Sequence, residues 1–112
     1  MQFLLIICHD NLFMPSEALT KEIIGWNGLM AKQGILKYSN PLRPAAEAIT
    51  IRVRKDKPMI SKGPFAVTNE KVAAYALIDC PNMEEAIGIA TTHPMAREAT
   101  IEVRQIWSDI SK

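Results

Sequence analysis

A chain of 112 residues has room for one hydrophobic core, so the sequence predicts a single domain over residues 1–112. Hydrophobic residues make up 48% of the chain and charged residues 22%, a composition that excludes a disordered or low-complexity protein. The net charge of +1 gives no overall electrostatic field to attract nucleic acid or an anionic membrane, so neither is expected as a partner.

The beginning of the chain indicates a protein of the cytoplasm. The apolar run at residues 3–7 is too short to cross a bilayer, and no basic residue precedes it as in a secretory signal. Cys8 and Cys80 lie in apolar surroundings without the spacing of metal ligands, which favours two buried, reduced thiols over a disulfide or a metal site. No phosphate-binding glycine loop or nucleophile elbow is present, so we expect no metal and no cofactor.

The first predicted elements are a strand and a helix. Residues 2–8 form a continuous apolar run, which is typical of a strand covered on both faces. Ser16 is a suitable N-cap for the helix that follows, and Gly34 can end this helix in a left-handed conformation. The helix has one apolar stripe: Leu19, Ile23, Trp26 and Met30.

A hairpin is predicted in the middle of the chain. Two prolines in residues 35–48 favour a short strand followed by an irregular loop. Apolar and polar residues alternate in residues 49–54, which predicts a half-buried strand. A turn at residues 55–58 then leads to a short edge strand at residues 59–61.

The second half of the chain repeats the order strand, helix, strand. Residues 72–80 are apolar at almost every position, and Asn82 with Glu85 forms a helix-capping pattern. We expect this helix to end by His93, because a proline follows, and the last strand to span residues 99–107.

This order predicts an α+β sandwich of ferredoxin-like topology, in which both helices cover one face of an antiparallel sheet. The strands at residues 2–8 and 72–80 are nevertheless apolar on both sides. An exposed apolar sheet face of this size favours burial against a second subunit. We therefore expect a homodimer formed through the sheet face.

The stretch GPFAVTNEKVAAYALIDCPNMEEAIGIATTHPMAREATIEVRQI and the strand ITIRVR before it resemble the YCII-related family. Within that family they resemble the branch named for an Asp-Gly-Pro-Phe tetrapeptide. The residues that carry the resemblance follow the order of the branch: Gly63, Pro64, Phe65, Glu70, Asp79, Glu85, Ala86, Ile87, His93, Pro94, Glu102, Val103 and Arg104. Position 62 departs from the pattern, because Lys62 stands where the branch has aspartate.

The resemblance implies a ferredoxin-like fold and a dimeric α/β barrel made by two sheets face to face. It also implies a pocket in which acid–base chemistry by a histidine and an aspartate has been proposed for some members. With Lys62 at the tetrapeptide, this chain cannot accept or relay a proton through a carboxylate at that position.

We expect a pocket between the turn at residues 62–65 and the strand at residues 99–106. Lys62 can anchor an anion, act as a base if burial removes its charge, or be solvated. Gly63 permits a strained turn, which can be purely structural, and Phe65 is either a core residue or a pocket wall.

Glu102 and Arg104 share a strand face and can pair with each other or hold a ligand, and Glu70 is a further ligand-binding candidate. Residues 51–62 carry five cations and one carboxylate, a local charge of +4. This segment is either an anion site or a solvated strand face that prevents edge-to-edge aggregation. No aromatic residues are interleaved with the cations, which argues against nucleic acid as the partner.

His9 and His93 are the catalytic candidates, because histidine has the intrinsic pKa nearest to neutrality. Asp10 adjoins His9, but neighbouring residues in a strand point to opposite faces, so the two do not form a dyad. His93 is alternatively a positively charged cap at the end of the second helix.

Three hypotheses for function follow from these residues. The first is a homodimer with a pocket for a small molecule, which Lys62 and nearby arginines would hold if it is anionic. The second is an enzyme of lyase or hydrolase type that uses His9 or His93 as acid–base on a small polar or aromatic substrate. The third is a non-catalytic assembly or partner-binding module.

Overall fold

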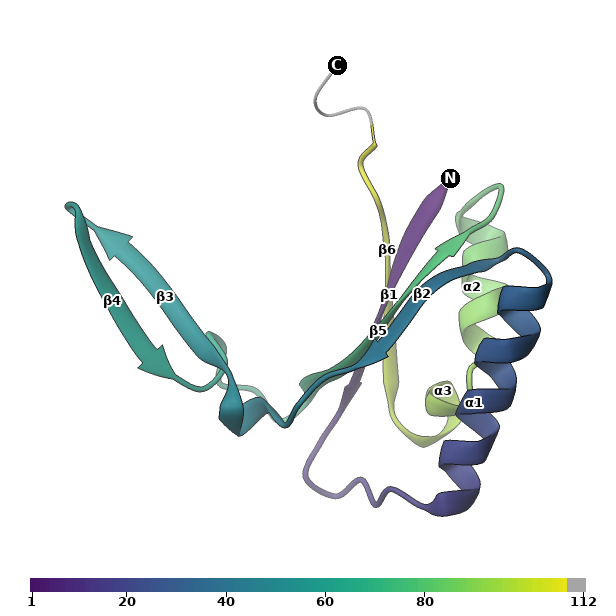
Figure 1. The fold of residues 1–112 in the computed structure, drawn as a ribbon, viewed down its shortest axis with the longest axis horizontal. Coiled ribbons are helices and arrows are strands. Elements are labelled where there is room, and N and C mark those ends of the chain that lie inside the picture. The colour runs from purple at the N-terminus through teal and green to yellow at the C-terminus, as the bar shows by residue number, and fades with distance from the viewer. Residues whose placement is uncertain (109–112) are drawn as a thin grey trace.

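The computed structural model describes residues 1–108, so residues 109–112 at the end of the predicted domain lie outside the described part. Four strands form one antiparallel sheet: β1 (Gln2–His9), β2 (Leu36–Pro41), β5 (Lys71–Asp79) and β6 (Thr100–Gln105). Their order across the sheet is β2-β5-β1-β6. Three helices lie on one face of it (Figure 1): α1 (Glu17–Lys32), α2 (Met83–Thr92) and α3 (Pro94–Glu98). The predicted α+β class is confirmed.

A second sheet consists of two strands only, β3 (Ile49–Arg54) and β4 (Lys57–Lys62), and follows the short 3-10 helix η1 (Ala45–Glu47). We call this hairpin, residues 49–62, the arm. It projects from the main sheet on the side opposite the helices (Figure 1). Lys55 and Asp56 at its tip have φ of 51° and 64°, the left-handed pair of angles that a two-residue hairpin turn requires.

The prediction that residues 49–54 are half-buried is wrong for the chain on its own. Ile49 and Ile51 are 56% and 65% exposed. Their strand pairs only with β4, and no second layer covers the hairpin. The radius of gyration is 16.0 Å, compared with about 13 Å for a compact chain of this length, which reflects the projecting arm.

The core lies between the main sheet and the helices. Phe3 and Leu5 of β1 are fully buried, and they form one cluster with Trp26 and Met30 of the predicted α1 stripe. Burying a large apolar side chain contributes about 1.5–3 kcal/mol, so this layer dominates the stability of the fold.

The predicted helix ends are confirmed. Ser16 Oγ accepts a hydrogen bond from the backbone N–H of Leu19 at 3.0 Å, and Asn82 Oδ1 accepts one from that of Glu85 at 2.9 Å. Gly34, after α1, has a φ of +76°. Such caps satisfy amides that the first helical turn leaves without partners.

Within residues 1–108, no layer covers the other face of the main sheet. Leu4 and Ile6 of β1 alternate with the buried residues and stay partly exposed, as do Tyr75 and Leu77, their partners in β5. We call this surface the open sheet face. Both thiols are free, and Cys80 is buried as predicted. The predicted burial of Cys8 is wrong for the chain on its own, because Cys8 lies on the open sheet face and is only half-buried. No helix within residues 1–108 is both long and apolar enough to cross a membrane.

Candidate functional site

Both histidines border one cavity between α1 and the main sheet. It has a volume of about 440 Å³, and its walls are mainly apolar. The apolar lining includes Ile7, Phe13, Leu19, Ile23 and Met95. Apart from the two histidines, its lining side chains are uncharged, so the cavity suits the apolar part of a small molecule.

His93 is buried at the junction of α2 and α3. Its Nδ1 accepts a hydrogen bond from the backbone N–H of Met95 at 3.0 Å, and its ring meets the Trp26 indole edge-on, with centroids 4.6 Å apart. Burial lowers the pKa of His93 to about 4. His93 does follow the end of α2, but the positive charge predicted for it there is wrong. The ring is neutral, because burial disfavours its charged form and because Nδ1 needs its lone pair to accept the Met95 N–H as the N-cap of α3.

His9 ends β1 and lies at the rim of the cavity. Its Nδ1 is 3.0 Å from the carbonyl oxygen of Asp10, and its ring stacks on Phe13 with centroids 4.6 Å apart. A carbonyl oxygen only accepts, so Nδ1 donates in this contact and Nε2 remains available to a ligand. The Asp10 carboxylate accepts instead from the backbone N–H groups of Leu12 and Phe13, which agrees with the prediction that no His9–Asp10 dyad forms.

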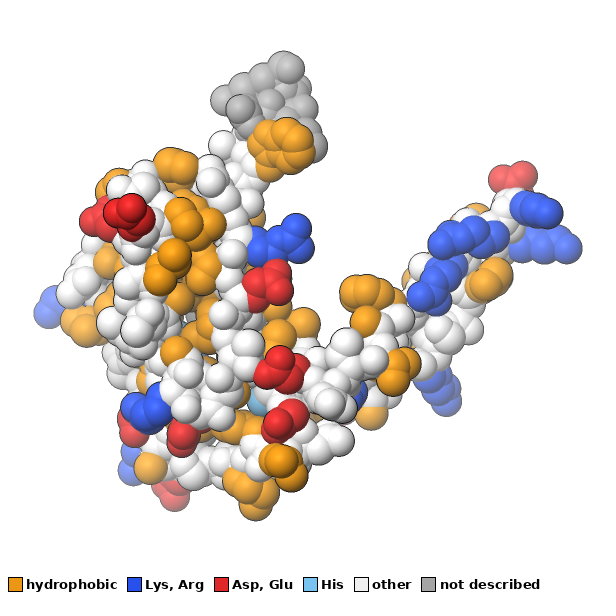
Figure 2. Space-filling view, turned by 180° about the vertical axis from the view of Figure 1, so that it is seen from behind, with side chains coloured by type: hydrophobic (Ala, Val, Ile, Leu, Met, Phe, Trp, Pro, Cys, Tyr) orange, Lys and Arg blue, Asp and Glu red, His pale blue; other side chains and the backbone are white. Residues whose placement is uncertain are grey.

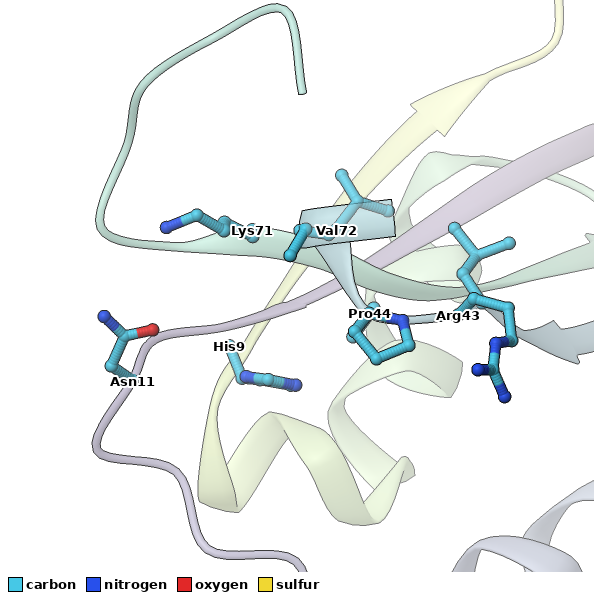
Figure 3. Close-up of a pocket in the computed structure, with 10 residues that line it drawn as sticks. His9, Asn11, Arg43, Pro44, Lys71 and Val72 are labelled. Atoms are coloured by element: carbon cyan, nitrogen blue, oxygen red, sulfur yellow. The ribbon is translucent and has the colours of Figure 1, made fainter. Parts of the chain in front are cut away.

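A second cavity adjoins the first at His9. Its volume is about 470 Å³, and it lies between the ends of β1 and β5 and the segment that leads into η1 (Figure 3). Its lining contains Arg43 and Lys71 and no carboxylate, and His9 and Ala73 border both cavities. In Figure 3 the His9 ring extends toward Pro44 and Arg43, whereas Lys71 extends in the other direction.

The two cations of this cavity keep free donors. Arg43 donates from Nε and Nη2 to the carboxylate of Glu47, at 3.2 and 3.0 Å, and Lys71 Nζ donates to the carbonyl oxygen of Thr68 at 2.9 Å. A guanidinium has five N–H donors and an ammonium has three, so both side chains can also bind an anion.

Glu70, Glu102 and Arg104 come together elsewhere, on the open sheet face. Thr100 Oγ1 donates to Glu70 Oε1, and Arg104 Nε lies 3.7 Å from Glu102 Oε2. Burial, Glu70 and Glu102, in this order, raise the pKa of the Cys8 thiol. These residues therefore form an acidic surface, separate from the histidine cavities.

The turn at residues 62–65 belongs to the root of the arm. Gly63 has a φ of +97°; its N–H donates to Ala48 O at 2.6 Å, and its carbonyl accepts from Thr50 Oγ1 at 2.7 Å. Lys62 is the last residue of β4, and Phe65 is 78% exposed. Neither cavity is lined by this turn or by residues 99–106, so the pocket predicted between them does not coincide with the histidine site.

Among the lining residues that were not predicted as site residues from the sequence are Asn27, Arg43 and Lys71. The Oδ1 atom of Asn27 is buried and accepts no hydrogen bond from any residue in the described part of the chain. Asn27 follows Ile23 by four positions, so helical spacing could have identified it. No sequence pattern marks Arg43 and Lys71 as neighbours, because only the fold brings the loop after β2 to the start of β5.

One protein family and one curated protein are similar to this chain. The model of the YCII-related domain matches residues 1–109. An uncharacterized protein of Rhizobium meliloti (strain 1021) is 34% identical over 67 residues, which cover 58% of this chain and 54% of that protein. The match thus spans about half the length of that curated relative.

Proposed function

The chain belongs to the YCII-related family, and we propose that it binds a small molecule with an anionic group and an apolar body. The observation that supports this most directly is that two adjoining cavities share His9. One has two cations, Arg43 on one side and Lys71 on the other, either of which would hold the anionic group, and the other offers apolar walls to the rest of the molecule. His9 contacts the ligand between these two parts.

The sizes of the cavities and the unused polar atoms favour such a ligand. Ligand pockets usually measure about 300–1,000 Å³, and each of the two cavities lies within this range. A buried acceptor without a donor is costly, and the amide oxygen of Asn27 would gain one from a hydroxyl or amide on the ligand. The anionic part would be held by charge-assisted hydrogen bonds.

Binding can be tested with three matched probes: phenylacetate, its uncharged amide and acetate. Calorimetry should show phenylacetate binding about tenfold more tightly than the amide or acetate, because only this probe has both an anionic group for the cations of one cavity and an apolar ring for the other. Lys71→Ala should weaken phenylacetate binding about fivefold, and the control Lys32→Ala, at the end of α1, should not. Equal binding of acid and amide, or no binding of any probe, would contradict the proposal.

A second candidate is acid–base catalysis by His9 on such a molecule, of lyase or hydrolase type. It is supported by the fixed His9 ring, whose Nδ1 is held by a backbone carbonyl while Nε2 is available for proton transfer. His93 is the weaker candidate, because its Nδ1 lone pair already accepts from Met95. If a bound acid is turned over, His9→Gln should abolish turnover and retain binding; full turnover by this variant would rule out the role.

We also propose a ferredoxin-like topology and a homodimer in which two open sheet faces form an α/β barrel. The topology is supported by the strand order β2-β5-β1-β6 with the helices on one face. The dimer is supported by the partly exposed Leu4, Ile6 and Leu77. The Asp-Gly-Pro-Phe branch is supported by Gly63, Pro64 and Phe65 (residues 63–65), with Lys62 replacing the aspartate.

A further inference from the structure

The arm has one apolar face and one polar, mainly basic face. In its strand register Ile51 lies opposite Ile60, and Arg54 lies opposite Lys57. Side chains opposite each other in a hairpin point to the same side. The apolar face carries Ile49, Ile51, Val53, Pro58 and Ile60, with Lys62 at its root opposite Ile49. The other face carries Arg52, Arg54 and Lys57 together with Thr50, Met59 and Ser61.

Nothing in residues 1–108 covers the apolar face. Ile51 is 65% exposed and Ile60 is 69% exposed. A two-stranded hairpin is only marginally stable in water unless it packs against another layer. An exposed apolar face of this kind marks a surface that binds a partner.

The charge of the arm complements that of the rest of the chain. Residues 51–62 carry +4, which leaves −3 on the remainder because the whole chain carries +1. Lys and Arg side chains gather on the arm, and acidic side chains lie along the margin of the body that faces it (Figure 2). Glu70 and Glu102, which both raise the pKa of Cys8, provide carboxylates on the open sheet face.

The arm is held away from its own body. The two hydrogen bonds of Gly63, with Ala48 and Thr50, fix its root, and from there it projects on the side opposite the helices (Figure 1). A second copy of this chain brings the same acidic body into the space beside the arm. In a two-fold symmetric pair each arm would meet the other body in the same way.

We propose that each arm clasps the body of a second copy of this chain. Its apolar face packs on that body, and the positive charge of Arg52 and Arg54 on its other face attracts the second copy's acidic residues Glu70 and Glu102. This inference rests on the proposed homodimer and adds that the arm, in addition to the open sheet face, holds the two copies together. Electrostatic complementarity sets the orientation, and the apolar contact supplies most of the affinity.

The apolar contact is tested by measuring the dimer dissociation constant in the analytical ultracentrifuge. The double variant Ile51→Lys with Ile60→Lys should raise this constant at least about tenfold, because it places two charges in the contact. Leu29→Lys is the matched control: Leu29 is also half-exposed, lies on α1, and should change the constant less than about twofold.

The charged contact is tested by reversal in both partners. Arg52→Glu with Arg54→Glu and, separately, Glu70→Lys with Glu102→Lys should each weaken the dimer, and mixing the two variants should restore it in part. Glu17→Lys on α1, on the far side of the sheet, is the control and should have no effect.

The outcomes separate the arm from the dimer. A wild-type monomer at micromolar concentration would overturn both the homodimer and the clasp. A wild-type dimer that neither arm variant weakens would overturn the clasp and leave the homodimer standing. Arm variants that lose binding to an oligonucleotide while the dimer is unchanged would assign the arm to nucleic acid, and would also overturn the clasp.

Discussion

The main sheet and the arm are both antiparallel, and alternate side chains of each point to an apolar face, yet only in the main sheet is such a face buried. Leu5 in β1 is fully buried, whereas Ile51 in β3 is 65% exposed. In both strands successive side chains point to opposite sides. Alternation therefore determines which residues share a face, and the elements that pack against that face decide whether it is covered.

The two regions consequently depend on different interactions. The main sheet is stabilised within the chain, because α1 and α2 pack on its inner face. The arm has no such layer among residues 1–108, so its apolar face contributes to stability only when another molecule covers it. Substitutions in the two regions should separate these contributions.

The largest expected effect is that of Leu5→Ala in the main sheet. It should lower the free energy of unfolding by about 3 kcal/mol, because it leaves a cavity in a closed core. Ile51→Ala in the arm should lower it by less than about 0.5 kcal/mol when chemical denaturation is followed at concentrations that favour the monomer. Equal losses would show that the chain itself covers the arm and would remove the contrast.

The next effect is the pH dependence that His93 gives to the main body. Its pKa is about 4 in the native state and about 6.5 in an unfolded chain, so the unfolded chain binds more protons between these values. The free energy of unfolding should therefore fall as the pH falls through this window, by about 2 kcal/mol at pH 5 relative to neutral pH.

Urea unfolding at both pH values checks this, with His93→Gln as the test variant and His9→Gln as its control. The exposed carboxylates act in all three proteins alike. His93→Gln should lose less stability on acidification than the wild type, whereas His9→Gln should follow the wild type more closely. The same pH dependence in His93→Gln and wild type would show that His93 is not held neutral by burial.

The smallest effect is expected at the root of the arm. Gly63→Ala forces a side chain into a backbone with φ of +97°, at a cost of about 1 kcal/mol. The arm should open locally, so amide exchange in β3 and β4 should become faster while exchange in β1 stays unchanged. Gly28→Ala in α1 is the control: an added Cβ meets no atom within 4 Å at either glycine, but only Gly63 has a positive φ. Faster exchange in β1 as well would show that the arm and the main sheet open together.

The candidate site was predictable only in part. The sequence identified His9 and His93 by residue type, and the fold brings them to one cavity from the ends of β1 and α2. It could not reveal that the protonation of His93 is controlled by burial, because the Trp26 contact and the enclosing helices are tertiary. Lys62, Phe65 and Glu102 were expected around one pocket. In the structure Lys62 and Phe65 lie at the root of the arm and Glu102 lies on the open sheet face, and none of the three lines a histidine cavity.

By itself the sequence determined most of the elements, the caps of α1 and α2 and the residues of each strand face, because capping and side-chain periodicity are local properties; it did not predict η1 or α3. It also carried the resemblance to the YCII-related family, which the match over residues 1–109 confirms. The tertiary structure decided that Arg43, Lys71 and His9 meet, that the arm projects, and that one sheet face stays open. These features depend on which distant segments pack together, and packing is set by the balance of burial over the whole chain rather than by any one segment.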